Sequence, residues 1–64
     1  MKLSKMKIEL EMARKNLTVT NLSKRYGVSR ARMHVILNSR EVTVMCAWRI
    51  ANALEVDVKE IVED

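Results

Sequence analysis

The sequence predicts an all-α fold in one compact domain, and three observations carry this prediction. The chain has 64 residues, enough for one small core and too few for a second domain. Hydrophobic residues make up 48% of it, whereas it has one glycine and no proline, which disfavours a β-rich fold with many tight turns. Apolar residues recur at steps of three and four, the spacing of one helix face. We therefore expect residues 1–64 to form a single bundle of short helices.

The first helix is expected over residues 4–15. Its apolar residues follow one another at three- and four-residue steps and form one continuous stripe: Leu3, Met6, Leu10, Ala13 and Leu17. Such a stripe is typical of a helix that packs one face on a core.

Four further helices are predicted by a repeated start signal. In this signal an apolar residue precedes a capping side chain, and a second apolar residue follows the cap by four positions. The four caps are Thr18, Ser29, Thr43 and Asp57. The apolar pairs around them are Leu17 with Leu22, Val28 with Met33, Val42 with Ala47, and Val56 with Ile61. At the last start, Glu60 has the capping-box spacing from Asp57. With the first helix, this makes five.

The segment from about residue 18 to 38 has the spacing of a helix-turn-helix. A helix from Val19 to about Tyr26 ends at Gly27, which is free to adopt a positive φ, and the next helix spans 29–38. The small side chain of Ser23 allows the second helix to cross the first closely. The fourth helix, which starts near residue 43, would then bury Ala47, Ile50, Ala51 and Leu54, and a short fifth helix would cover 58–63.

The helix over 29–38 has one apolar edge and one polar, basic edge. Met33, Ile36 and Leu37 would anchor it to the core, which leaves Arg30 and Arg32 on another edge. Two arginines in a first turn oppose the helix dipole, so helix stability does not explain them. An external anion does. The major groove of DNA, about 12 Å wide, admits one such helix.

The charges are unevenly distributed along the chain. Residues 1–40 hold ten Lys/Arg and two acidic residues, a net charge of +8. Residues 41–64 hold two Lys/Arg and six acidic residues, a net charge of −4, so the whole chain has +4. A basic pole is typical of a nucleic-acid or anionic-membrane partner. Glu9, Glu11 and the ordered caps favour a folded domain over a membrane-surface peptide. No apolar run reaches the roughly 18 residues of a membrane span, and we expect a cytoplasmic protein.

No enzyme, metal or cofactor site is expected. The sequence has no nucleophile with a base and an orienting acid, and no glycine-rich phosphate loop. The single His34 and Cys46 cannot fill a four-coordinate zinc sphere, so we interpret Cys46 as a packing residue. No small-molecule ligand is expected in one domain of this size.

Two stretches together resemble a known family. The first consists of LTVTNLSKRYGVSR at 17–30 with ILNSR at 36–40, and the second is AWRIANALEVDV at 47–58. The pair is similar to the Cro/C1-type, or XRE-like, helix-turn-helix family with its lambda-repressor-like five-helix fold. The resemblance implies a domain that places its helix over 29–38 in the major groove.

The resemblance also implies which residues touch DNA. The positions that match the family's base-facing ones are Arg30, Ala31, Arg32, His34 and Val35. Arginine can bind guanine O6 and N7 together, and small apolar side chains can contact a thymine methyl. The expected phosphate contacts lie at the start of the first helix of the motif and after its second helix: Thr18, Thr20, Asn21, Asn38, Ser39 and Arg40.

The sequence departs from the family pattern at two places. Val19 stands where a glutamine commonly contacts a phosphate, so that side-chain contact is lost. Met12 and Leu37 stand where many members pair an arginine with a glutamate. Replacing both partners of such a pair by apolar residues keeps the packing sensible. We therefore predict that Met12 packs against Leu37.

One apolar group has two interpretations. Met45 and Trp48 lie off the expected buried face of their helix, and Val58 and Val62 are near in sequence. They form either another wall of the core or a homodimer patch, which would match a palindromic operator.

The function predicted is that of a sequence-specific transcriptional regulator of double-stranded DNA, a Cro-like or minimal repressor of a phage or mobile element. The alternative is a protein-interaction module, an antitoxin or adaptor that uses the same fold. Its working surface would be the acidic C-terminal third and the apolar residues around Trp48.

Overall fold

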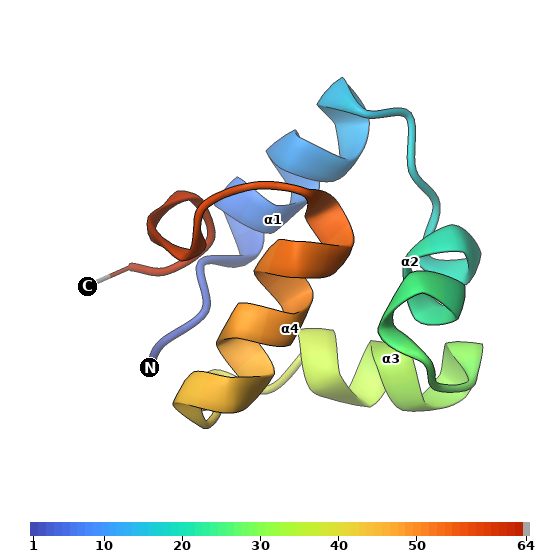
Figure 1. Cartoon of the computed structure of the whole chain (residues 1–64). Coiled ribbons are helices and arrows are strands. Elements are labelled where there is room, and N and C mark those ends of the chain that lie inside the picture. The colour runs from blue at the N-terminus through green and yellow to red at the C-terminus, as the bar shows by residue number, and fades with distance from the viewer. Residues whose placement is uncertain (64) are drawn as a thin grey trace.

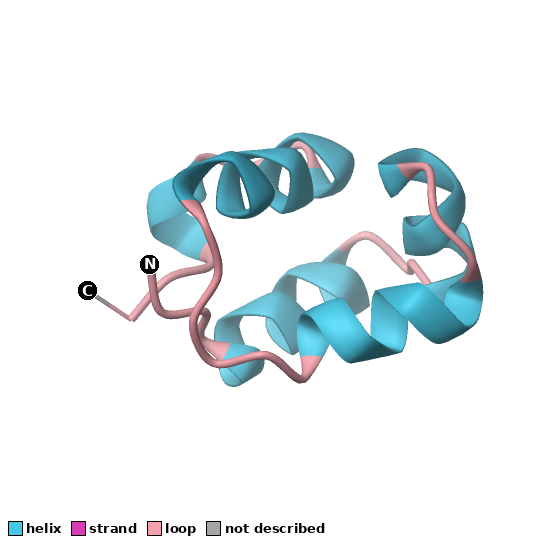
Figure 2. Cartoon of the chain, turned by 90° about the horizontal axis from the view of Figure 1, so that it is seen from below, coloured by secondary structure: helices cyan, strands magenta, loops and turns pink. Residues whose placement is uncertain are grey.

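A computed structural model describes residues 1–63 and confirms the all-α prediction. Its four α-helices are α1 (Lys5–Arg14), α2 (Val19–Tyr26), α3 (Arg30–Leu37) and α4 (Val44–Leu54). Figures 1 and 2 show helices joined by short loops, with α2 beside α3 at one end and both termini at the other. The expected fifth helix is shorter than predicted: it is a single 3-10 turn, η1 (Val58–Glu60).

The predicted caps of α2, α3 and α4 are confirmed. The side chain of each accepts a 3.1 Å hydrogen bond from the backbone N–H three residues ahead: Thr18, Ser29 and Thr43. A capping box occurs at Thr18, where Asn21 is the reciprocal partner. Each of these caps satisfies a backbone donor that the helix itself leaves free.

The capping box predicted at Asp57 is wrong. Asp57 does cap η1, but its carboxylate accepts from the N–H of Lys59 at 2.9 Å, while the N–H of Glu60 donates to the backbone oxygen of Asp57. A 3-10 turn winds more tightly than an α-helix, so the donor that reaches the cap is one residue nearer.

Helix α1 turns a different face to the core than the apolar stripe predicted. Its buried residues are Ile8, Glu11 and Met12, whereas Met6 is 71% exposed and Leu10 is 56% exposed. Ala13, the remaining helical member of the stripe, is exposed as well. The helix carries two apolar faces, and only the one with Ile8 and Met12 meets the rest of the molecule. The ends of the stripe, Leu3 and Leu17, lie outside the helix and do pack on the core.

The core draws on all four α-helices, on Leu3 and on the C-terminal segment. Its fully buried large side chains are Leu22, Met33, Ile50, Leu54 and Ile61. The buried face predicted for α4 is confirmed, since Ala47, Ile50, Ala51 and Leu54 are all 0% exposed.

Two interpretations were open for Met45, Trp48, Val58 and Val62, and the structure separates these residues into a buried pair and an exposed pair. Val58 and Val62 are only 6% and 3% exposed, so they belong to the core and cannot form a surface patch. Met45 and Trp48 are 73% and 47% exposed, so the interpretation as a core wall is wrong for them. The buried face of α4, with Ile50 and Leu54 among its members, is the one that packs on the core, and Met45 and Trp48 lie off this face.

Met12 and Leu37 both turn toward the core, as predicted, while their direct packing against each other stays a prediction. Met12 is buried, and Leu37 is partly buried and packs against the core. Both line one open hollow of about 480 Å³ between α1, α3 and the start of α2. Val19 lines the same hollow, so the three residues at which the sequence departs from the family pattern share one place in the fold.

A terminal clasp, formed by residues 1–4, 40–42 and 61–63, closes the end of the molecule where both termini lie (Figure 1). Four hydrogen bonds between backbone amides and carbonyls, 2.8–3.0 Å long, join residues 1–4 to the two other segments. Within the clasp, Lys2 pairs with Glu41 and Leu3 with Val62 in isolated β-bridges. The clasp therefore fixes the loop that follows α3.

Candidate nucleic-acid interface

The turn between α2 and α3 has the geometry that the helix-turn-helix spacing predicts. Gly27 adopts φ +94°, a left-handed conformation that favours glycine, and its N–H donates to the backbone carbonyl oxygen of Ser23 at 2.8 Å. The N–H of Val28 donates to the same oxygen at 3.0 Å, which completes the helix end. Ser23 is 3% exposed, and its hydroxyl donates back to the oxygen of Thr20. Ser23 thus gives α2 a small side chain whose hydroxyl is hydrogen-bonded within the helix, and α2 packs against α3.

Helix α3 is anchored by two buried side chains. Met33 is 0% exposed and Ile36 is 9% exposed, with Leu37 packed beside them. All five side chains predicted to face bases are exposed: Arg30, Ala31, Arg32, His34 and Val35. The helix therefore presents a continuous outward edge from its first residue.

Arg30 and Arg32 have no ion pair or side-chain hydrogen bond with residues 1–63. The first turn of α3 contains no acidic residue, and its N-cap is the uncharged Ser29. The helix dipole and the two cations therefore add to one positive field at this end of α3. Nothing in the described chain neutralises this field, and an anion such as a phosphate or a guanine edge would do so.

The residues predicted to contact phosphate lie at two places. Thr18, Thr20 and Asn21 surround the N-terminus of α2 and are exposed. The hydroxyl of Thr18 donates to Oδ1 of Asn21 at 2.8 Å and accepts from the backbone N–H of Asn21. The amide nitrogen of Asn21 has no partner within residues 1–63 and remains a donor for an anion.

The other three follow α3. Asn38 and Arg40 are exposed, but Ser39 is half-buried and its hydroxyl donates to the oxygen of Val35 at 2.9 Å. In this conformation Ser39 offers a phosphate no hydroxyl proton. Oδ1 of Asn38 accepts from Nζ of Lys5 at 2.9 Å, which brings a lysine of α1 to the end of α3.

Lys5 is a residue of this surface that the sequence analysis missed. A signal for it exists, because the first turn of α1, like that of α3, contains basic residues and no acid. Cations at such a position are unfavourable for the helix alone, and the same argument that singled out Arg30 applies to Lys5.

The model of the Cro/C1-type HTH DNA-binding domain matches residues 7–64 of the sequence. The chain belongs to this family. Searches among curated proteins and among solved structures find no match to the chain. The family membership confirms the resemblance and makes the chain a DNA-binding domain of the helix-turn-helix type.

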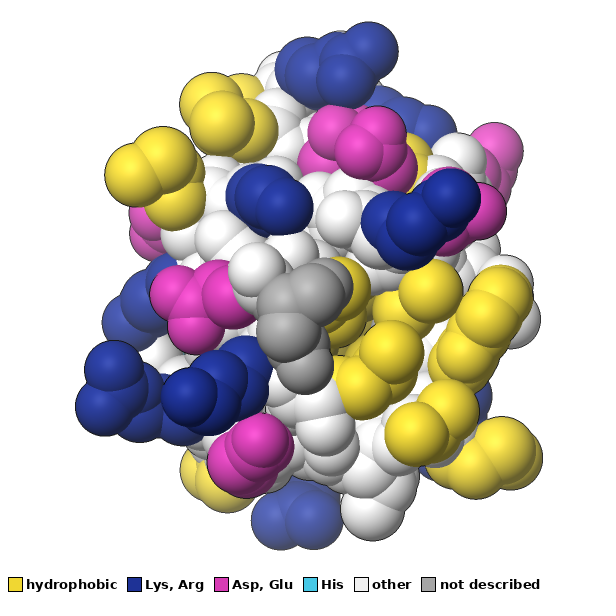
Figure 3. All heavy atoms as spheres, turned by 90° about the vertical axis from the view of Figure 1, so that its left-hand side faces the viewer, with side chains coloured by type: hydrophobic (Ala, Val, Ile, Leu, Met, Phe, Trp, Pro, Cys, Tyr) yellow, Lys and Arg dark blue, Asp and Glu magenta, His cyan; other side chains and the backbone are white. Residues whose placement is uncertain are grey.

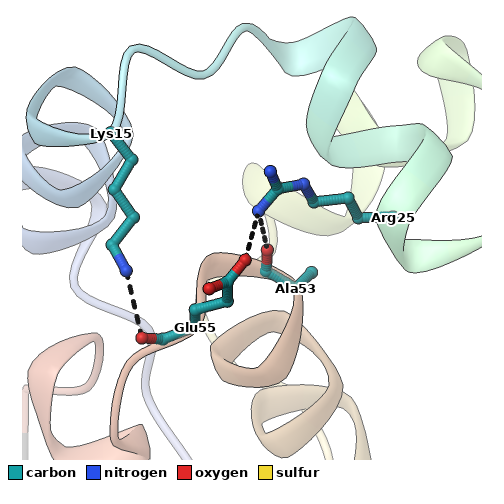
Figure 4. A network of polar contacts seen from close by, with 4 residues as sticks. All are labelled: Lys15, Arg25, Ala53 and Glu55. Atoms are coloured by element: carbon teal, nitrogen blue, oxygen red, sulfur yellow. Dashed lines mark hydrogen bonds and ion pairs between the residues drawn. The ribbon is translucent and has the colours of Figure 1, made fainter.

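Other cations of this Cro/C1-type domain serve its fold. Figure 4 shows Arg25 and Lys15 converging on the end of α4. Arg25 donates to the carboxylate of Glu55 at 3.0 Å and to the oxygen of Ala53 at 3.2 Å, and Lys15 donates to the oxygen of Glu55 at 3.0 Å. Because α4 has no basic residue in its own last turn, these side chains supply the positive charge that a helix C-terminus favours.

Arg49 fastens α4 to the helix-turn-helix. Its guanidinium lies 4.2 Å from the centre of the Tyr26 ring and donates to the backbone carbonyl oxygen of Tyr26 at 2.8 Å. Burial raises the pKa of Tyr26, and the hydrogen bond that its hydroxyl donates to Sγ of Cys46 raises the pKa further, while the charges of Arg49 and Arg32 lower it. Half-buried Cys46 thus packs within the domain, as the sequence analysis expected.

Residues 1–63 contain neither a metal-binding cluster nor a membrane-spanning helix. This part of the domain has no group of three or more His, Cys, Asp or Glu side chains that could hold a metal ion. None of its helices combines the length and the apolar character needed to cross a membrane.

Proposed function

We propose that this Cro/C1-type domain is a sequence-specific regulator of transcription that reads the major groove of double-stranded DNA with α3. The observation that supports this most is the division of α3 into a buried edge with Met33 and Ile36 and an exposed edge that begins with two unpaired arginines. Arg30 and Arg32 are suited to guanine, and exposed Val35 is suited to a thymine methyl.

The proposed phosphate contacts flank this edge. The N-terminus of α2, with Thr20 and Asn21, supplies free donors and the positive end of a helix dipole. Past the end of α3, Asn38, Lys5 and Arg40 supply an amide and two cations. Contacts on both sides of the reading helix would set its orientation in the groove.

We further propose that two copies bind a palindromic operator and occlude a promoter, as a Cro-like or minimal repressor of a phage or mobile element does. Val44, Met45 and Trp48 form an apolar α4 patch, with exposed fractions of 56%, 73% and 47%. Figure 3 shows hydrophobic side chains gathered at the lower right of one face of the molecule, with a smaller group apart from them at the upper left. A symmetric contact through the α4 patch would give a two-fold dimer, and two-fold dimers of helix-turn-helix domains bind half-sites about 34–36 Å apart.

The test is selection of bound duplexes from a random-sequence library at moderate salt, followed by the salt dependence of binding to the winner. Enrichment of an inverted repeat is expected. A single enriched half-site would refute the symmetric dimer, and no enrichment at all would refute sequence-specific binding. Arg30→Ala is expected to weaken binding to the selected duplex. Lys59→Ala is the matched control, because Lys59 is an exposed cation on η1, outside the proposed interface.

A protein-interaction module remains the second candidate, and the exposure of Trp48 supports it. A docked protein would cover the indole and change its fluorescence. A change of Trp48 fluorescence with a partner protein, and none with any DNA, would favour the module over the regulator.

A further inference from the structure

One acidic side chain of α1 lies in the basic part of the chain without a partner. Residues 1–40 contain two acids, Glu9 and Glu11. Glu11 is buried and pairs with Arg14 at 3.1 Å, whereas Glu9 is exposed and has no ion pair among residues 1–63. Glu9 also lies in the middle of α1, away from the two end turns in which the helix dipole acts. Neither an ion pair nor the dipole therefore explains this charge.

Glu9 lines the hollow between α1, α3 and the start of α2. Most of the lining is apolar, and its four polar members are Lys5, Glu9, His34 and Asn38. Lys5, which precedes Glu9 by one turn, donates to Asn38 at 2.9 Å and makes no ion pair with Glu9. The carboxylate of Glu9 is thus the one acidic group in the lining, and nothing in the lining pairs with it.

The same hollow borders both groups of proposed phosphate contacts. Val19, which lines it, is the first residue of α2 and stands between Thr18 and Thr20. Asn38, which also lines it, directly follows α3. His34 brings the proposed reading edge to the hollow as well. A DNA strand that contacts both groups would therefore pass over the hollow and bring its phosphates towards Glu9.

We infer that Glu9 limits the affinity of the domain for DNA by repelling the phosphate backbone over this hollow, an inference that rests on the DNA binding proposed above. Contacts on either side of the hollow attract the strand, and the carboxylate between them offsets part of that attraction. The repulsion acts on the backbone, which is the same in every sequence, so base preference stays with α3.

The first experiment measures affinity for the selected duplex by fluorescence anisotropy at several salt concentrations. Glu9→Gln is expected to tighten binding about two- to fivefold, the effect of removing one charge a few ångströms from a phosphate in water. Glu9→Lys should tighten it further and steepen the plot of log affinity against log salt by about one. Glu60→Gln and Glu60→Lys make the same charge changes at an exposed acid on η1 and should leave affinity and slope nearly unchanged.

The second experiment locates the phosphate that Glu9 repels. Methylphosphonate groups remove the charge of one backbone phosphate at a time along the selected duplex. At one position the replacement is expected to tighten binding of the parent and to weaken binding of Glu9→Lys. A role of Glu9 in folding alone would not reverse the effect of a single phosphate, and circular dichroism verifies that each variant stays helical.

Equal effects of the Glu9 and Glu60 variants, or a scan in which no position reverses its effect, would overturn the inference. If the random library yields no preferred sequence, the same four variants are compared on a duplex of mixed sequence at low salt. Tighter binding by the Glu9 variants alone would then uphold the inference although sequence-specific regulation had failed.

Discussion

Two neighbouring side chains of α3 offer a direct test of its two edges. Met33 is 0% exposed and Val35 is 56% exposed, although only one residue separates them. Met33→Ala removes three buried heavy atoms, and truncations of this kind cost about 2–5 kcal/mol. Val35→Ala removes atoms that already face solvent and exchanges a β-branched residue for a better helix former, so it changes stability by roughly 0.5 kcal/mol or less.

The expected loss at Met33 is large for a domain of this size. A chain of 64 residues is stable by about 3–10 kcal/mol, so a loss of about 3 kcal/mol removes a third or more of the total. At about 4–8 °C per kcal/mol, the midpoint of thermal unfolding falls by about 12–24 °C. Met33→Leu, which keeps volume and apolar character, costs under about 1.5 kcal/mol and serves as the control.

The assay is thermal unfolding followed by circular dichroism, paired with DNA binding at a temperature where each variant is folded. Met33→Ala should then bind the selected duplex as the parent does, while Val35→Ala should bind it less tightly with its stability unchanged. A cost at Met33 below about 1 kcal/mol, or equal costs at both positions, would refute the division of α3 into a core edge and a DNA edge.

Three further predictions concern the interface, a helix cap and a tyrosine. Arg30→Ala is expected to cost about 1–3 kcal/mol on the selected duplex and to relax the base preference at one position, as measured by fluorescence anisotropy on single-base variants; equal weakening on all sequences would mean that Arg30 contacts phosphate alone. Thr43→Ala removes the cap of α4 and should cost about 1 kcal/mol in urea unfolding, whereas an unchanged midpoint would show that the cap contributes nothing. Burial and Cys46 raise the pKa of Tyr26 above 10.0, so the stability from this group is full below pH 10.0 and falls as the pH rises through the folded-state pKa. Absorbance titration should show Tyr26 ionising later in the folded chain than in urea, and a matching titration would contradict this.

The helix starts could be predicted from sequence because each depends on residues close together. Ser29 and Val28 are adjacent, and the N–H that Ser29 accepts belongs to Arg32 in the next turn. Gly27 is similarly local, since a left-handed residue at a helix end needs no distant partner. The exposure of the α3 edge followed from helical periodicity around Met33. Contact of that edge with DNA stays a prediction.

Features that depend on distant partners could not be predicted in this way. Helix α1 contains two apolar registers, one with Met6 and Leu10 and one with Ile8 and Met12, and which one meets the core depends on how the whole helix docks. Trp48 is outside although it is the largest apolar side chain, because another face of α4, with Ala47, Ile50 and Leu54, packs on the core. In the interface itself, the hydrogen bond from Lys5 to Asn38 joins residues 33 positions apart, and no local pattern records it.

The terminal clasp has a consequence for the order in which the molecule assembles. Its hydrogen bonds join residues 1–4 to segments about 40 and 60 positions away, so closing these loops costs chain entropy that only docked helices offset. We therefore expect the clasp to form only after the helices have docked, when Leu3, Ile61 and Val62 complete the core. Since residues 40–42 follow α3 directly, we expect the end of α3 to gain its final position only at this late step of folding.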